Sequence, residues 1–256
     1  MVDIGKIKSL QSEAASIAED LGLLVESLTD KEIQRWGRSF ERQLILSYPE
    51  REISDLFQRR QAELLLGAMV AKKQMDAEID GEIPGSGKVG GPLVIRAAFL
   101  GIGDDWEDAS PFTTGSPQNW IHSGTTLLGG TAGNPIRMGE NAVLSIIAIG
   151  SYHPSPKLES VKFTVDGKEK PIVITNFAQK KSDLKIKELD SALILKENTT
   201  ILGRVFFSSA FGSSVIDYPY LIGAAYIKEP QLRVHDPYEL LGTSAARDVN
   251  KVVLTT

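Results

Sequence analysis

Through roughly the first 78 residues, apolar side chains recur at the three- and four-residue spacing that lines one face of an α-helix. The first run predicts one helix and consists of Ile4, Ile7, Leu10, Ala14, Ile17, Leu21 and Leu24. Thr29 followed by Glu32 forms a capping box, in which each side chain accepts a hydrogen bond from the other residue's backbone N–H, so a second helix is expected to start there. The apolar side of this second helix carries Ile33, Trp36, Phe40 and Leu44.

A third helix is expected after Pro49, because proline is tolerated in a first helical turn, where its missing N–H would be unpaired in any case. The helix is expected to run to about Ala77, with the apolar positions Ile53, Leu56, Phe57, Leu64, Leu65 and Met69. Its other face is dense in charged residues and includes the pair Arg59–Arg60. Residues 1–79 are therefore predicted to form a helical arm.

The composition changes at residues 80–92, which hold five glycines and two prolines, a content typical of a hinge. The helical period then disappears, and residues 93–256 carry short apolar runs separated by turn residues. These runs predict strands at 93–100, 141–149, 161–165, 171–177, 184–186, 192–195, 201–207 and 220–227.

Asp166–Gly167 lies between two of these runs and predicts a hairpin, since the pair favours a turn with positive φ. About eight short strands without intervening helices are typical of an antiparallel sandwich or a jelly roll. The predicted fold class is therefore α+β, with the helical arm followed by a jelly-roll-like antiparallel β-sandwich in residues 93–256. That domain ends in a mixed tail at 234–256, with a helical turn expected at 237–241 and an edge strand at 252–255.

The bulk composition excludes several classes of protein. The chain has 256 residues, of which 42% are hydrophobic and 24% charged, values that suit a globular core. A net charge of −5 argues against a protein whose main work is to neutralise phosphate, so direct nucleic-acid binding is not expected. The chain has no cysteine, which removes disulfides, thiolate metal sites and cysteine nucleophiles. No apolar run approaches the roughly 18 residues of a spanning helix, and the first residues lack the apolar region of a secretory signal.

One segment invites a phosphate-loop interpretation. Gly85–Val89 contains Gly-Lys, but a phosphate loop needs a serine or threonine where Val89 stands and a glycine where Glu82 stands. A strand pattern also follows where a helix is required. The segment is interpreted as part of the linker.

Four acidic residues surround Trp106 in the run Asp104–Asp108. Oxygen-rich loops suit hard cations such as Ca²⁺, but the alternating register of an EF-hand is missing. A solvated acidic loop is the favoured interpretation, with cation binding left open. Trp106 would then lie at a subunit contact or at the rim of the domain.

No catalytic, cofactor-binding or metal-ligating residue is assigned, and no cofactor is expected. His122, His153 and His235 are far apart and lack metal-ligand spacing. Gly212–Ser214 lacks the closing glycine of a nucleophile elbow. The Gly/Thr-rich segment Ser123–Pro135 can cradle anions in some proteins, and a plain connection is favoured here.

The apolar faces of the arm need a partner, because short helices are marginal alone in water. The arm either packs on the sandwich of its own chain or buries its faces against other subunits. The candidates for a subunit interface are Ile33, Trp36, Phe40, Leu44, Leu56, Phe57, Trp106 and Trp120.

This organisation resembles virion coat proteins of the jelly-roll kind, with a helical arm at 1–78, a Gly/Pro hinge at 80–92 and a strand-rich region at 93–227. The resemblance covers nearly the whole chain in outline and rests on architecture. It implies a structural, non-enzymatic protein that is made in the cytoplasm and assembles into a virion or another particle. Its partners would be copies of itself and other structural proteins. The arm mixes acidic and basic residues, so contacts with other subunits are expected of it in preference to contacts with a genome.

Two other classes remain open. The first is a ligand-binding β-sandwich module, in which Trp106 and Trp120 would stack on a sugar ring or bind a protein. The second is an enzyme whose site is assembled from residues distant in the sequence.

Overall fold

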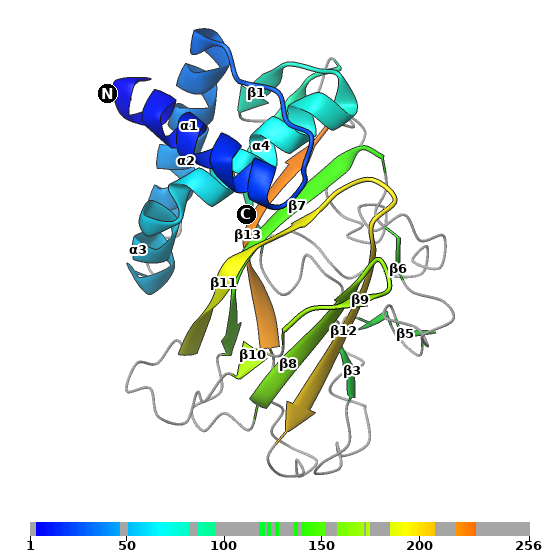
Figure 1. The fold of residues 1–256 in the computed structure, drawn as a ribbon. Helices are drawn as coiled ribbons and strands as arrows, with labels where there is room; N and C mark the ends of the chain where they lie inside the picture. Colours follow the sequence, from blue (N-terminus) through cyan, green and yellow to red (C-terminus); the bar gives the residue numbers. More distant parts are fainter. Residues whose placement is uncertain are drawn as a thin grey trace.

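The computed structural model describes residues 4–46, 51–81, 87–95, 118–120, 122–123, 126–127, 136–137, 140–151, 158–171, 173–174, 185–207 and 219–228. Within these residues the chain is an α+β protein, in which helices come first and mostly antiparallel strands follow (Figure 1). The described helices are α1 (Ile4–Asp20), α2 (Asp30–Leu46), α3 (Arg51–Arg59) and α4 (Gln61–Met75).

The capping box at the start of α2 is confirmed. The backbone N–H of Thr29 donates to Oε2 of Glu32 at 2.8 Å, and the N–H of Glu32 donates to Oγ1 of Thr29 at 3.4 Å. The predicted third helix is instead two helices that meet at Arg60, whose φ of −104° and ψ of 27° lie outside the helical region. At this break the side chain of Arg60 bonds to Glu63 and to the backbone of β11.

The strands form two main sheets. The inner sheet has the order β1 (Ile79–Gly81), β2 (Val89–Ile95), β13 (Pro219–Ile227), β7 (Ala142–Ser151) and β11 (Lys185–Leu195). The outer sheet has the order β10 (Val173–Ile174), β8 (Leu158–Val165), β12 (Thr200–Phe207) and β3 (Gln118–Trp120), with β9 (Lys168–Glu169) paired to β8 and β6 (Ile136–Arg137) paired to β12. The short strands β4 (His122–Ser123) and β5 (Thr126–Leu127) pair with each other.

Eight of these strands pair in a nested order. Taken along the chain they are β2, β3, β7, β8, β10, β11, β12 and β13. The first pairs with the last, the second with the seventh, the third with the sixth and the fourth with the fifth. All four pairs are antiparallel, so this part of the chain has the connectivity of one long hairpin folded across two sheets.

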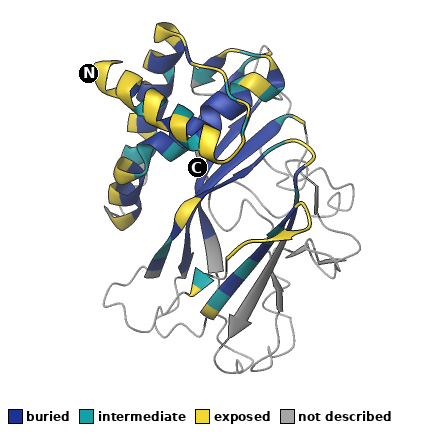
Figure 2. Cartoon of the chain, in the orientation of Figure 1, coloured by how far each residue is buried: buried dark blue, intermediate teal, exposed yellow. Residues whose placement is uncertain are grey.

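Burial shows how the layers stack. Successive side chains of a strand point to opposite faces. On β13, Ile222, Ala224 and Tyr226 belong to a core cluster with the helices, and the alternate residues Leu221, Ala225 and Ile227 are buried as well. The inner sheet is therefore covered on both faces, as Figure 2 shows by its dark blue strands beneath the helices. On β8 only alternate residues are buried, namely Val161, Phe163 and Val165, so the outer sheet has one wetted face.

Several predicted strands differ from the observed ones in their bounds. Strand β2 begins at Val89, inside the predicted hinge 80–92, and pairs in parallel with β1. The two strands predicted at 184–186 and 192–195 are one strand, β11. The hairpin at Asp166–Gly167 is confirmed, because both residues have positive φ, 50° and 72°, and β9 follows the turn. The tail at 234–256 lies outside the described residues.

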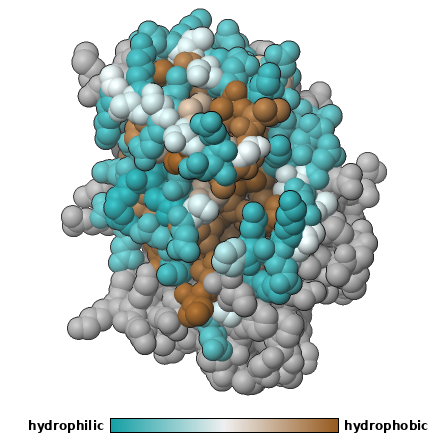
Figure 3. All heavy atoms as spheres, in the orientation of Figure 1, coloured by the Kyte–Doolittle hydropathy of each residue, from teal (hydrophilic) through white to brown (hydrophobic). Residues whose placement is uncertain are grey.

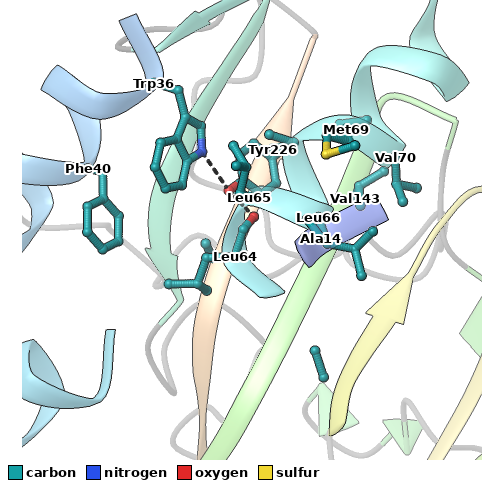
Figure 4. Close-up of a cluster of buried hydrophobic side chains, with 14 of the residues drawn as sticks. Ala14, Trp36, Phe40, Leu64, Leu65, Leu66, Met69, Val70, Val143 and Tyr226 are labelled. Carbon is teal, nitrogen blue, oxygen red and sulfur yellow. Dashed lines mark hydrogen bonds between the residues drawn. The ribbon is translucent and has the colours of Figure 1, made fainter. Parts of the chain in front are cut away.

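One buried contact fastens the helices to the inner sheet (Figure 4). Nε1 of Trp36 donates to the hydroxyl of Tyr226 at 3.1 Å, and that hydroxyl donates to the carbonyl of Leu64 at 2.6 Å. The Trp36 ring also stacks on Phe40, with ring centroids 5.0 Å apart. These bonds join α2, α4 and β13 through a tyrosine that is fully buried, and burial raises the pKa of its hydroxyl well above the ordinary range.

Two glycines make room for the Tyr226 ring. A Cβ on Gly67 of α4 would lie 2.7 Å from Cε2 of Tyr226 and 2.9 Å from Cβ of Ser145. A Cβ on Gly91 of β2 would lie 2.8 Å from Cδ1 of the same ring, and φ at Gly91 is +135°. Because glycine has no Cβ, the backbones of α4 and β2 can both lie directly against the Tyr226 ring.

We expect Gly67→Ala to destabilise the chain by about 1–3 kcal/mol, because the new methyl group has to displace the Tyr226 ring or Ser145. The free energy of unfolding from denaturant titration measures the effect. Gly5→Ala, the same change at an exposed position of α1, is the control and should leave stability equal or slightly raised. Equal stability of the two variants would contradict the close packing described here.

Candidate functional site

An open groove of about 390 Å³ lies where three parts of the chain meet. One wall is the α1–α2 linker at Leu21–Leu23, the second is the hairpin of β8 and β9 with the residues that follow it, and the third is β11. Phe163, Val165 and Leu189 give the groove apolar walls. Residues of β11 and β10, the last described strands of the inner and the outer sheet, both line it.

The wall formed by β11 contains a large bulge. Glu188 pairs with Ala148 of β7 and Leu193 pairs with Ile146, so residues 189–192 stand against Ile147 alone. Such an insertion bends a strand and leaves the extra residues unpaired. All four bulge residues line the groove, which means that the irregularity shapes this wall.

Two arginines hold the bulge from the helical side. Nη1 of Arg60 donates to the carbonyl of Leu189 at 2.8 Å, and Arg59 forms an ion pair with Glu188 at 2.6 Å. Burial disfavours ionisation of the Glu188 carboxyl, but the hydrogen bonds and charges of the two arginines outweigh it and lower its pKa. The break between α3 and α4 therefore places Arg60 where it fixes the groove.

The α1–α2 linker is held by the Glu32 carboxylate, which is 2% exposed. Its Oε2 accepts from Nζ of Lys72 at 2.8 Å, and its Oε1 accepts from the backbone N–H of Ile79 at 3.0 Å. Lys72 also donates to the carbonyl of Ser27 and forms an ion pair with Glu26, both in the linker. One ion pair thus ties the linker to α2, α4 and β1.

The ionisation of both partners is shifted by this contact. Burial opposes charge on Glu32, yet the hydrogen bonds from Lys72 and from the Thr29 and Ile79 N–H groups prevail and lower its pKa. Burial likewise opposes charge on Lys72, and the contacts with Glu32 and Glu26 prevail and raise its pKa. The pair is therefore charged over a wide range of pH around neutrality.

One exposed apolar side chain lines the groove. Among the described residues, the large hydrophobic side chains that are exposed are Leu21 at 40%, Leu24 at 74% and Ile174 at 58%. Of these, Leu21 lines the groove, whereas Leu24 and Ile174 only follow lining residues in the sequence. Figure 3 shows apolar surface running down the middle of this face, with hydrophilic surface on both sides.

Charged groups that have no ion-pair partner among the described residues flank this groove. Lys168, Lys170 and Lys196 line the groove, and none of them forms an ion pair within the described part of the chain. Glu19 and Asp20 immediately precede the linker wall, are exposed and likewise have no side-chain partner there. The groove thus combines apolar walls with Lys168 and Lys170 on the hairpin wall and Lys196 at the end of β11. Asp166 and Asp190 also line it, and Glu19 and Asp20 lie beside the linker wall.

The predicted interface residues of the arm are largely buried in the chain's own core. Ile33, Trp36, Phe40, Leu56 and Phe57 are each at most 4% exposed, and Leu44 packs partly buried against the same cluster. The arm therefore packs on the sheet of its own chain. Contact of these side chains with another subunit stays a prediction, and it would require copies to exchange their helices.

The other predicted candidates are not brought together by the described residues. Trp106, the acidic loop 104–108, His153, His235 and the segment 212–214 lie outside them. Trp120 and His122 are described only as backbone positions in β3 and β4. Of the segment resembling a phosphate loop, Val89 begins strand β2 and Lys88 pairs with Glu78 and Asp80.

Sequence reasoning missed the groove. A signal was present in the gap between the strands predicted at 184–186 and 192–195, because that gap holds most of the bulge. Nothing in the sequence indicated that Lys168 and Lys170 line a groove. In the sequence they belong to an ordinary polar turn, and only the fold brings this hairpin beside β11.

Comparison with known proteins does not assign this chain to a family. No protein-family model matches the sequence, and no curated protein matches it. Within the described residues, no helix is both long and apolar enough to cross a membrane.

We expect Lys72→Met to lower the free energy of unfolding by about 3–5 kcal/mol, because it leaves the buried Glu32 carboxylate without its cation. Lys73→Met, at the exposed neighbouring position, should change stability by less than about 1 kcal/mol. Denaturant titration of both variants at neutral pH measures the difference, and similar values would show that the pair does not hold the linker.

A pH series separates the charge of Glu32 from its packing. Its pKa is lower in the folded chain than in the unfolded chain, so its contribution is complete above the unfolded value of about 4.3 and is lost as pH falls through the folded value. The difference in Tm between the wild type and Glu32→Gln should therefore shrink from about pH 6 to about pH 3. Glu13→Gln changes an exposed position and is the control. The difference in Tm between the wild type and this variant should not change with pH in this way. A constant difference for Glu32→Gln would contradict the electrostatic account.

Proposed function

We propose that this chain is a non-enzymatic structural subunit with a jelly-roll sandwich, which assembles with copies of itself into a virion coat or a similar particle. The observation that carries the proposal is the nested pairing of eight antiparallel strands. A long hairpin rolled into two sheets of four strands is the connectivity of the jelly roll, a fold used by viral capsid proteins and by lectins. The order β2-β13-β7-β11 opposite β3-β12-β8-β10 supports this fold.

The position of the helices supports a rigid subunit. Helices α2 and α4 cover one face of the inner sheet, and the Tyr226 contact locks them there. A subunit with this arrangement presents fixed outer surfaces to its neighbours, which suits closed assemblies built from repeated identical contacts. Such a chain would act in a virion or another assembled particle, with other structural proteins as further partners.

A second function is favoured by the groove. Its volume of about 390 Å³ lies within the roughly 300–1,000 Å³ of small-molecule sites, and its walls are largely apolar with a few charged groups. A monomeric sandwich module that binds a ligand there is therefore the alternative. The mass of the purified chain distinguishes the two functions.

We expect the purified chain to give a mass above that of one 27.9 kDa chain by light scattering, and the mass to rise with protein concentration. Negative-stain images of the largest fraction should show closed particles or rings of uniform size. A sample denatured in guanidinium chloride gives the mass of the single chain as the control. A monomer at every concentration would contradict the coat function and leave the ligand-binding module.

A further inference from the structure

We propose that the groove between the α1–α2 linker and the β8–β9 hairpin is the contact surface for a second copy of this chain, related by a two-fold axis. The inference deepens the proposed self-assembly and rests on it. Leu21, Phe163, Val165 and Leu189 form its apolar walls. Lys168 and Lys170 line it, and Glu19 and Asp20 immediately precede its linker wall.

The apolar evidence is that Leu21, one of the exposed large hydrophobic side chains among the described residues, lines this groove together with Phe163, Val165 and Leu189. Single exposed apolar residues are normal on a protein surface. An apolar hollow that is bordered by charged residues is typical of an interaction site. The apolar surface therefore marks the centre of a contact.

The charges indicate which partner fits. Glu19 and Asp20 end α1, where the helix dipole already places partial negative charge, and the last turn contains no basic residue. These carboxylates therefore lie in an unfavourable position that a cation would relieve. Lys168 and Lys170, across the groove, have no acidic partner within the described residues. The two carboxylates can therefore pair with the two lysine ammonium groups.

A two-fold axis through the groove brings the two groups together. The acids stand beside the linker wall and the lysines stand on the hairpin wall, so rotation places the acids of one copy over the lysines of the other. The same contact then forms twice, because each copy supplies both surfaces, as an isologous interface requires. The apolar side chains of both copies would meet between the two charged contacts.

Charge reversal tests this arrangement. The lysine variant combines Lys168→Glu with Lys170→Glu, and the acid variant combines Glu19→Lys with Asp20→Lys. Each variant alone should associate about tenfold or more weakly than the wild type, because every contact now joins like charges. A mixture of the two variants in equal amounts should restore association, because each contact again joins opposite charges. Light scattering and sedimentation over a concentration series measure both effects.

Two controls keep the result specific. Lys31→Glu with Arg38→Glu reverses two exposed basic positions of α2 outside the groove and should leave association unchanged. The acid variant adds lysines at the end of α1, which favours the helix, so its Tm should not fall. Leu21→Asp tests the apolar walls separately and should also weaken association.

The outcomes separate this inference from the proposed function. Restoration in the mixture supports the two-fold contact. If the wild type assembles and the variants assemble equally well, or the mixture fails to restore association, the groove is not the contact and the coat function stands. If the wild type is a monomer at every concentration, the proposed function and this contact are both wrong.

Discussion

A single buried hydroxyl joins the helices of this chain to its inner sheet. Tyr226 accepts from Trp36 and donates to Leu64, so both polar capacities of one oxygen are used inside an apolar core. Because a buried polar group left unpaired costs about 1–3 kcal/mol, α2, α4 and β13 must keep their positions for the hydroxyl to stay satisfied. Gly67 and Gly91 leave the space that the ring occupies, because a Cβ at either position would collide with it. The layer of helices is thereby set on the sheet with little freedom.

The groove follows from that placement. With α4 fixed, Lys72 reaches Glu32 and the linker after α1 is held against the body of the chain. With α4 beginning at Gln61, Arg60 reaches the bulge of β11. The two ion-pair networks define two walls of the groove, and the β8–β9 hairpin closes the third side. An apolar hollow can persist at the surface because charged contacts, and not its own packing, hold its walls.

Local signals in the sequence predicted local structure correctly. The Thr29–Glu32 pair and the Asp166–Gly167 turn each act within a few residues, and both were confirmed. The α+β class followed from the change of hydrophobic period. The break at Arg60 was not predicted, and the carbonyl of β11 that Arg60 binds there lies far along the chain, where the local sequence gives no sign of it. Strand order and the groove depend on pairings between distant residues, which one sequence does not display.

The nested strand order also sets a timetable for synthesis. Trp36 and Tyr226 are 190 residues apart, and β2 pairs with β13, the last described strand. At about 5–20 residues per second, a ribosome needs roughly 10 to 40 seconds to pass from one to the other. Throughout that interval the helices can meet β1, β2 and β7, but β13 with its Tyr226 hydroxyl is still missing from the sheet beneath them. The core under the helices is therefore completed only when β13 has been synthesised.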